Sequence, residues 1–284
     1  MAAAMASLFA QTLDEAGIGG GGELRALVFL VIACTVLLQG LSGGLVARLL
    51  HLRRPVHRGY AILGANELGH ALGKLLREAG EELVFLDSNP AACKTVEEDG
   101  FRVLYGSAVE QRTLQRAQIE DRAACIAVTP NPEVNLLFGR MTTRDFGADR
   151  VYLALARDQS RVTPETVGDA DGHVLFGVPR DLEMWALRLR RQTATVDAWE
   201  KDAEPAVFGE DADDGPAFFQ TPSNLLLPMM MTRGGTMVPV NSAQEFKIGD
   251  LVYFAVSVER RAESEEWLRQ QGWRPSTGLS VGRR

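Results

Sequence analysis

The chain has 284 residues, of which 46% are hydrophobic and 24% are charged, and its mean hydropathy is -0.05. These values are typical of a packed globular protein and exclude both a disordered chain and a membrane protein with many spans. The formal net charge of -7 argues against nucleic-acid binding, which needs a basic surface, so we expect no nucleic-acid partner. Cys34, Cys93 and Cys125 are far apart and form neither a disulfide framework nor a metal-ligand pattern, so we expect no metal site.

One long uncharged segment stands out from this average. Residues 26–47 contain no charged side chain, and a helix of that length spans roughly 33 Å, which is enough to cross a bilayer core. A buried globular helix rarely stays uncharged for so long, and a signal peptide would begin with basic residues rather than Asp14, Glu15 and Glu23. We therefore predict a leader over residues 1–23 and a transmembrane helix over residues 24–50.

The flanks of this segment predict its orientation. Four arginines follow it closely, at Arg48, Arg53, Arg54 and Arg58. Since positive charge marks the cytoplasmic side, we expect a single-pass protein of the cell (inner) membrane with cytoplasmic C-terminal domains. Within the segment, glycines 40 and 44 are either a helix-packing face or simply tolerated in a membrane helix.

The next segment has the order strand, glycine turn, helix, strand, acidic residue. Residues 59–64 read as a short buried strand, residues 68–79 have apolar side chains at helical spacing, and residues 83–86 read as a second buried strand that ends at Asp87. This is the order of a dinucleotide-binding βαβ unit, in which an acidic residue follows the first glycine by ~20 positions.

Each residue type in this unit has a physical role in nucleotide binding. Gly64 permits the tight turn, and Gly69 lets the helix pack closely on the strand. Free N–H groups at the start of the helix stabilise a phosphate. Asp87 accepts hydrogen bonds from a ribose, and the following Ser88 offers no positive charge to a 2′-phosphate, so we expect NAD, NADH, ATP, ADP or AMP rather than NADP. The expected phosphate donors are the backbone groups of Asn66, Glu67 and Leu68.

Asn66 departs from the fingerprint, which has a glycine at this position. That glycine leaves room for the pyrophosphate to approach the backbone. Asparagine tolerates left-handed backbone geometry, but its side chain occupies space. The alternative interpretation is a Rossmann unit that has lost its nucleotide.

Strands and helices continue to alternate beyond this unit. Helices are predicted at 90–99, 109–117 and 132–146, and strands at 101–105, 124–129, 151–156 and 174–176. The alternation predicts an α/β fold with a Rossmann-like, doubly wound parallel sheet over residues 58–180. The ligand crevice is then expected at the carboxyl ends of the strands, at Gly64, Asp87, Gly106, Ser107, Ala108 and Thr129.

The remainder is predicted to hold a smaller, β-rich part. Residues 181–215 read as an amphipathic helix followed by an acidic linker, and the linker lacks the spacing of a calcium-binding loop. Residues 216–284 read as a small β-rich C-terminal domain and tail, with strands at 224–231, 236–240 and 251–256 and a helix at 263–271.

Residues 58–180 resemble the RCK N-terminal (TrkA-N) domain, which regulates conductance in potassium channels and transporters. The resemblance rests on the turn from Gly64 to Gly69, on Asp87, on the Gly106-Ser107-Ala108 corner and on residues 129–135. The family usually has an acidic residue at the position of Ser107 and a glycine at that of Asn66. Residues 27–55 resemble the last membrane helix of NhaP-type sodium(cation)/proton antiporters, whose transport core is absent from this sequence.

These resemblances imply a non-enzymatic regulatory role in cation transport. The expected partners are an adenine nucleotide, the membrane, transporter membrane helices and a second copy in a homodimer. The sequence fits either the C-terminal part of an antiporter or a single-span subunit, and we do not expect it to transport ions alone. Two alternatives remain: an NAD-dependent oxidoreductase, for which no catalytic motif is present, and a dimerisation module with no nucleotide.

Overall fold

The computed structural model describes residues 2–49, 58–157, 161–204 and 224–276. The chain divides into two compact units, residues 1–56 and 57–284, which are described separately.

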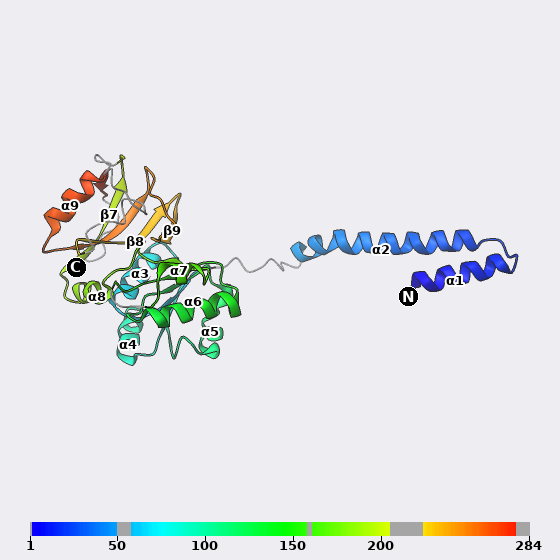
Figure 1. The fold of residues 1–284 in the computed structure, drawn as a ribbon, viewed down its shortest axis with the longest axis horizontal. Coiled ribbons are helices and arrows are strands. Elements are labelled where there is room, and N and C mark those ends of the chain that lie inside the picture. Colours follow the sequence, from blue (N-terminus) through cyan, green and yellow to red (C-terminus); the bar gives the residue numbers. More distant parts are fainter. Residues whose placement is uncertain (1, 50–57, 158–160, 205–223, 277–284) are drawn as a thin grey trace. The chain divides into compact units, whose positions relative to one another are not determined.

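The first unit is a helical hairpin. Helix α1 (Ala2–Glu15) is joined by a glycine turn to α2 (Gly21–Leu49), and the two helices contact each other along the hairpin (Figure 1). Within α2, residues Gly21–Gln39 have a mean hydropathy of 2.0, so the helix is long and apolar enough to cross a membrane. Apolar side chains of this stretch are exposed, among them Leu30 and Leu38. The first helix was not predicted and lies in the expected leader, and the side chains of residues 40–49 lie outside the description.

The second unit contains a six-stranded parallel sheet in the order β3-β2-β1-β4-β5-β6. This is the strand order of doubly wound dinucleotide-binding folds, so the predicted Rossmann-like sheet is confirmed. Its strands are β1 (Tyr60–Leu63), β2 (Leu83–Asp87), β3 (Arg102–Tyr105), β4 (Ala124–Ala127), β5 (Val151–Leu153) and β6 (His173–Val174).

Helices cover both faces of this sheet because successive strand residues point to opposite sides. Ile62 and Phe85 pack in one hydrophobic core with α3, whereas Leu63 and Leu86 pack in another with α5 and α6. The helices are α3 (Glu67–Glu78), α4 (Pro90–Glu98), α5 (Gln111–Ala117), α6 (Pro132–Phe146) and the short α7 (Pro164–Gly168). A 3-10 turn, η1 (Ile119–Asp121), precedes β4.

The rest of this unit forms a five-stranded antiparallel sheet in the order β11-β7-β10-β8-β9. Helix α9 (Arg261–Gln270) packs on one face, where Leu268 joins Phe254 and Trp273 in a third core. Helix α8 (Leu182–Arg190) connects the parallel sheet to this one. The strands are β7 (Ala194–Lys201), β8 (Leu226–Arg233), β9 (Thr236–Pro239), β10 (Leu251–Ser257) and β11 (Trp273–Pro275).

The two sheets share a hydrophobic core. Met230 and Tyr253 of the antiparallel sheet belong to the same buried cluster as Ile62 and the apolar face of α3. The Tyr60 hydroxyl donates a hydrogen bond to the Met237 carbonyl oxygen at 2.9 Å. The predicted C-terminal sheet is therefore present and is packed directly on the parallel domain.

Strand β7 falls within residues 181–215, where we predicted a helix and an acidic linker. The helix is present as α8, but residues 194–201 form a strand that pairs with β10. The strand pattern is hidden because half-buried positions of β7 carry charged side chains. The Asp197 carboxylate is paired with the Arg261 guanidinium at 2.8 Å. The described part of the linker ends at residue 204, so the acidic run at 209–214 lies outside the described residues.

Candidate functional site

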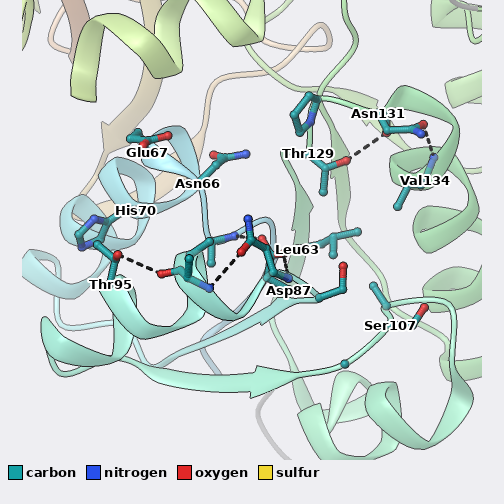
Figure 2. A pocket seen from close by; sticks show the side chains of 18 of the residues that line it. Leu63, Asn66, Glu67, His70, Asp87, Thr95, Ser107, Thr129, Asn131 and Val134 are labelled. Carbon is teal, nitrogen blue, oxygen red and sulfur yellow. Dashed lines mark hydrogen bonds between the residues drawn. The ribbon is translucent and has the colours of Figure 1, made fainter. Parts of the chain in front are cut away.

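A cavity of about 870 Å³ lies on the crevice side of the parallel sheet. It lies where β1, β2, β3 and β4 end, which is where ligands bind in open α/β sheets (Figure 2). Eight of the predicted site residues line it: Asn66, Glu67, Asp87, Ser88, Gly106, Ser107, Ala108 and Thr129. The other three do not line it: Gly64 lies in the turn after β1, and Leu68 and Gly69 lie in the first turn of α3.

The turn after β1 has the backbone geometry that its glycines permit. Gly64 has a φ of +110°, which residues with a side chain rarely adopt. A Cβ atom on Gly69 would lie 2.0 Å from the Gly64 carbonyl oxygen, so α3 crosses the turn at a distance that only glycine allows. The side chain of Leu68 is fully buried in the core. These residues set the geometry of the turn and of the start of α3, and they do not line the cavity.

Asn66 does not use the left-handed geometry that asparagine tolerates. Its φ and ψ of -75° and 178° are extended, not left-handed, because it is the N-cap of α3. Its Oδ1 atom accepts the Gly69 N–H at 2.9 Å, and its Nδ2 atom donates to the Val128 carbonyl oxygen at 2.7 Å. The side chain therefore uses one of the helix N–H groups and connects the turn after β1 to the end of β4.

Replacing Asn66 by glycine is expected to lower the free energy of unfolding by about 1–2 kcal/mol, because the cap and the bond to Val128 are both lost. Urea unfolding followed by circular dichroism measures this. Asn89→Ala is the matched control, since Asn89 caps α4 through the Ala91 N–H. It should cost about 1 kcal/mol or less. Equal stability of Asn66→Gly and the wild type would show that the link to β4 contributes nothing.

Asp87 lies at the end of β2 with its carboxylate directed at backbone N–H groups. Its Oδ2 atom accepts the Ala65 N–H at 2.7 Å, and its Oδ1 atom accepts the Asn89 N–H at 2.8 Å. Each carboxylate oxygen has a second lone pair, so both can still accept a hydroxyl group. The carboxylate is thus fixed in place at the cavity wall, next to Ser88, as ribose recognition requires.

The end of β3 supplies the predicted small-residue corner. Gly106 has a φ of +157° and donates its N–H to the Asp87 carbonyl oxygen at 3.0 Å. A Cβ atom there would lie 2.9 Å from the Thr113 hydroxyl oxygen, so a larger residue would push against the Thr113 side chain of α5. Ser107 and Ala108 follow in the cavity wall. Ser107 places a neutral hydroxyl group where the family that the sequence resembles usually has an acidic residue.

The loop after β4 is held by a buried asparagine. Asn135 is fully buried, and its Oδ1 atom accepts both the Thr129 N–H at 3.1 Å and the Thr129 hydroxyl at 2.6 Å. Its Nδ2 atom donates to the carbonyl oxygens of Thr129 and Ala154. Asn131 caps α6 through the N–H groups of Glu133 and Val134. Thr129 therefore has a single fixed position at the crevice.

Two cavity residues that we did not predict carry or can carry positive charge. Arg190, the last residue of α8, forms an ion pair with Glu67. His70 Nε2 lies 2.8 Å from Asp99 Oδ2, and Lys74 Nζ lies 2.9 Å from the same oxygen. The sequence offers no local signal for Arg190, because it is 123 positions from its partner. For His70, the available signal is its place in the first turns of the predicted helix, close to the expected crevice.

The pKa values of these groups follow from their surroundings. Burial raises the pKa of Glu67, but the hydrogen bond and charge of Arg190 outweigh this, so the pKa lies below its usual range. Burial lowers the pKa of His70, and the charge of Lys74 lowers it further, although Asp99 acts in the opposite direction. At pH 7 we therefore expect an ionised Glu67 and a mainly neutral His70.

Comparison with known proteins finds similarity over the parallel domain. Residues 60–168 match the family model of the TrkA-N domain. The glutathione-regulated potassium-efflux system protein KefC of Cronobacter sakazakii is 30% identical over 97 residues, as is KefC of Escherichia coli. The match covers 34% of this chain but 16% of each KefC, so the chain corresponds to a small part of these relatives.

Two solved structures are similar to parts of this chain. The TrkA-N domain of inner membrane protein ybaL from Escherichia coli has a TM-score of 0.39 and 15% identity, covering 48% of this chain and 96% of that chain. The GsuK channel bound to NAD has a TM-score of 0.38 and 14% identity, covering 87% of this chain and 48% of that chain.

Proposed function

We propose that the chain is the nucleotide-sensing regulatory part of a membrane cation transporter, because residues 60–168 match the family model of the TrkA-N domain. The observation that carries this proposal is the cavity at the strand ends, where Asp87 and the first turn of α3 face the same space. The match to KefC, a potassium-efflux protein, supports a role in potassium transport. Sodium/proton transport is the second possibility within this proposal. The proposed role is regulatory and non-enzymatic.

The proposed ligand is an adenine nucleotide: NAD, NADH, ATP, ADP or AMP. Asp87 is fixed by two backbone N–H groups and would accept the ribose hydroxyls. A 2′-phosphate would place negative charge against that carboxylate, and the neighbouring Ser88 side chain supplies no compensating charge. The proposal therefore favours ligands with a free 2′-hydroxyl.

The proposed location is the cytoplasmic side of the cell membrane, with α2 as the anchor. Its apolar stretch Gly21–Gln39 supports this, as does the excess of arginines that follows the helix. The chain would act with transporter membrane helices and as a homodimer. A nucleotide that binds two dimer arrangements with different affinity would shift the population between them and so bias the transporter.

Calorimetric titration of the full chain in detergent tests the nucleotide proposal. We expect heat of binding and a raised melting temperature with at least one of NAD, NADH, ATP and AMP, because a ligand of the folded state stabilises it. NADP should bind at least about tenfold more weakly than NAD, since the 2′-phosphate meets the Asp87 carboxylate. GTP is the control for base recognition. No heat and no thermal shift with any adenine nucleotide would contradict the proposal.

A further inference from the structure

Arg190 links the cavity to a part of the chain beyond the matched family segment. It is the last residue of α8, lies outside residues 60–168, and lines the cavity. Its side chain is 66% exposed, whereas that of its ion-pair partner Glu67 is 26% exposed. Glu67 is the first residue of α3, where a phosphate would meet the helix N-terminus. Arg190 is therefore held by a carboxylate at the place where an anionic ligand is expected.

The charges of the cavity show why this arginine matters. Among the described lining residues, the ionisable side chains are those of Glu67, His70, Asp87 and Arg190. With His70 mainly neutral at pH 7, two carboxylates face the cavity together with one permanent cation. A phosphate group placed there would be repelled by the carboxylates. Among these lining residues, Arg190 supplies the positive charge that can balance the phosphate. Its planar guanidinium group also matches the geometry of phosphate oxygens.

Helix α8 is also positioned to transmit a change at Arg190. It packs against α3 and against β7, the strand that follows it in the sequence. Its Trp185 side chain is fully buried in the core shared by the two sheets. A shift of the C-terminal end of α8 would therefore be transmitted to the antiparallel sheet through these contacts.

We propose that Arg190 is the phosphate-binding arginine of this site, and that a nucleotide phosphate takes it from Glu67 and so couples occupancy of the cavity to α8 and the antiparallel sheet. In the free protein the guanidinium pairs with the Glu67 carboxylate. In the bound protein it pairs with the phosphate, and the negative charge of Glu67 opposes binding. This inference rests on the proposed nucleotide function and names the residue that senses the phosphate.

Titrating adenosine, AMP and ADP into three full-length variants tests the assignment. Arg190→Gln should weaken AMP and ADP binding by about tenfold or more, because a charge-assisted hydrogen bond is lost, and should leave adenosine within about twofold. Glu67→Gln should strengthen AMP binding, because it removes both the competing partner and the repulsion. Arg191→Gln is the matched control: Arg191 is adjacent and exposed but does not line the cavity, so it should bind like the wild type.

The outcomes separate this inference from the proposed function. A wild-type chain that binds none of these ligands contradicts the nucleotide function itself. A wild type that binds AMP, with Arg190→Gln binding it equally well, overturns the role of Arg190 alone. Arg190→Gln that weakens adenosine as much as AMP also overturns it, because the effect would then not concern the phosphate.

Hydrogen exchange measured by mass spectrometry tests the coupling. Saturating AMP should change the exchange of amides in α8 and β7 of the wild type and of Arg191→Gln. The same saturation should leave those amides unchanged in Arg190→Gln, although residues of the turn after β1 still respond. An identical response of α8 and β7 in Arg190→Gln would overturn the coupling.

Discussion

Gly69→Ala is expected to lower the free energy of unfolding by about 3 kcal/mol or more, at the upper end of what overpacking costs. The added Cβ atom would lie 2.0 Å from the Gly64 carbonyl oxygen and 3.3 Å from a methyl carbon of Val128. The carbonyl belongs to the backbone of the turn and cannot rotate away as a side chain would. Relief requires α3 to move off β1, which would disturb the core that Leu68, Leu72 and Leu75 form beneath the helix.

Urea unfolding of the full chain in detergent, followed by circular dichroism, measures this loss. Gly168→Ala is the matched control, because a Cβ atom at Gly168 meets nothing within 4 Å. That variant should keep its stability or gain up to about 1 kcal/mol from the reduced entropy of the unfolded chain. A Gly69→Ala protein as stable as Gly168→Ala would show that α3 does not cross the turn as closely as described.

Asp87→Asn is expected to weaken adenine-nucleotide binding by about ten- to a hundredfold, the effect of losing a hydrogen bond to a charged group. The carboxylate accepts two backbone N–H groups with its two oxygens. An asparagine amide has one acceptor oxygen, so its NH₂ group would face either the Ala65 or the Asn89 N–H, and the side chain would have to turn. The variant therefore loses both the charge and the fixed orientation that ribose hydroxyls need.

Calorimetric titration with AMP and NAD gives the affinities, and a thermal melt without ligand shows that the variant is folded. Asp145→Asn is the control, because Asp145 is exposed on α6 and does not line the cavity. Its affinities should match those of the wild type. If Asp87→Asn binds AMP as tightly as Asp145→Asn does, the ribose is not recognised by Asp87.

Much of the parallel domain was predictable because its signals are local. The helices begin at residue types that cap them: Asn89 and Asn131 accept N–H groups at the starts of α4 and α6, and each is followed by proline. Buried strands such as β1 and β4 are apolar throughout, as strands covered on both faces must be. The end of β2 is predictable in the same way, because the apolar run stops at Asp87. Eight predicted site residues consequently meet in one cavity.

Two features could not be predicted from the sequence because their interaction partners lie far away along the chain. The charged residues of β7 reduce its strand signal, and they are satisfied by residues such as Arg261, which lies 64 positions away from Asp197. Arg190 joins Glu67 across 123 positions, so nothing near either residue predicts the pair. The role of Asn66 is predictable only in part. Its capping of α3 is a local interaction, but its hydrogen bond to the Val128 carbonyl oxygen requires β4 to lie beside β1.

By itself the sequence determined the order of strands and helices, the apolar helix α2, and the chemistry offered at the strand ends, because periodicity, capping and turn residues act over a few positions. The tertiary structure alone decided that the antiparallel sheet shares a core with the parallel one, that Asn66 crosses to β4, and that Arg190 reaches the cavity. These features depend on which surfaces pack together. That packing is a property of the whole chain, since the contacts join residues that no local pattern connects.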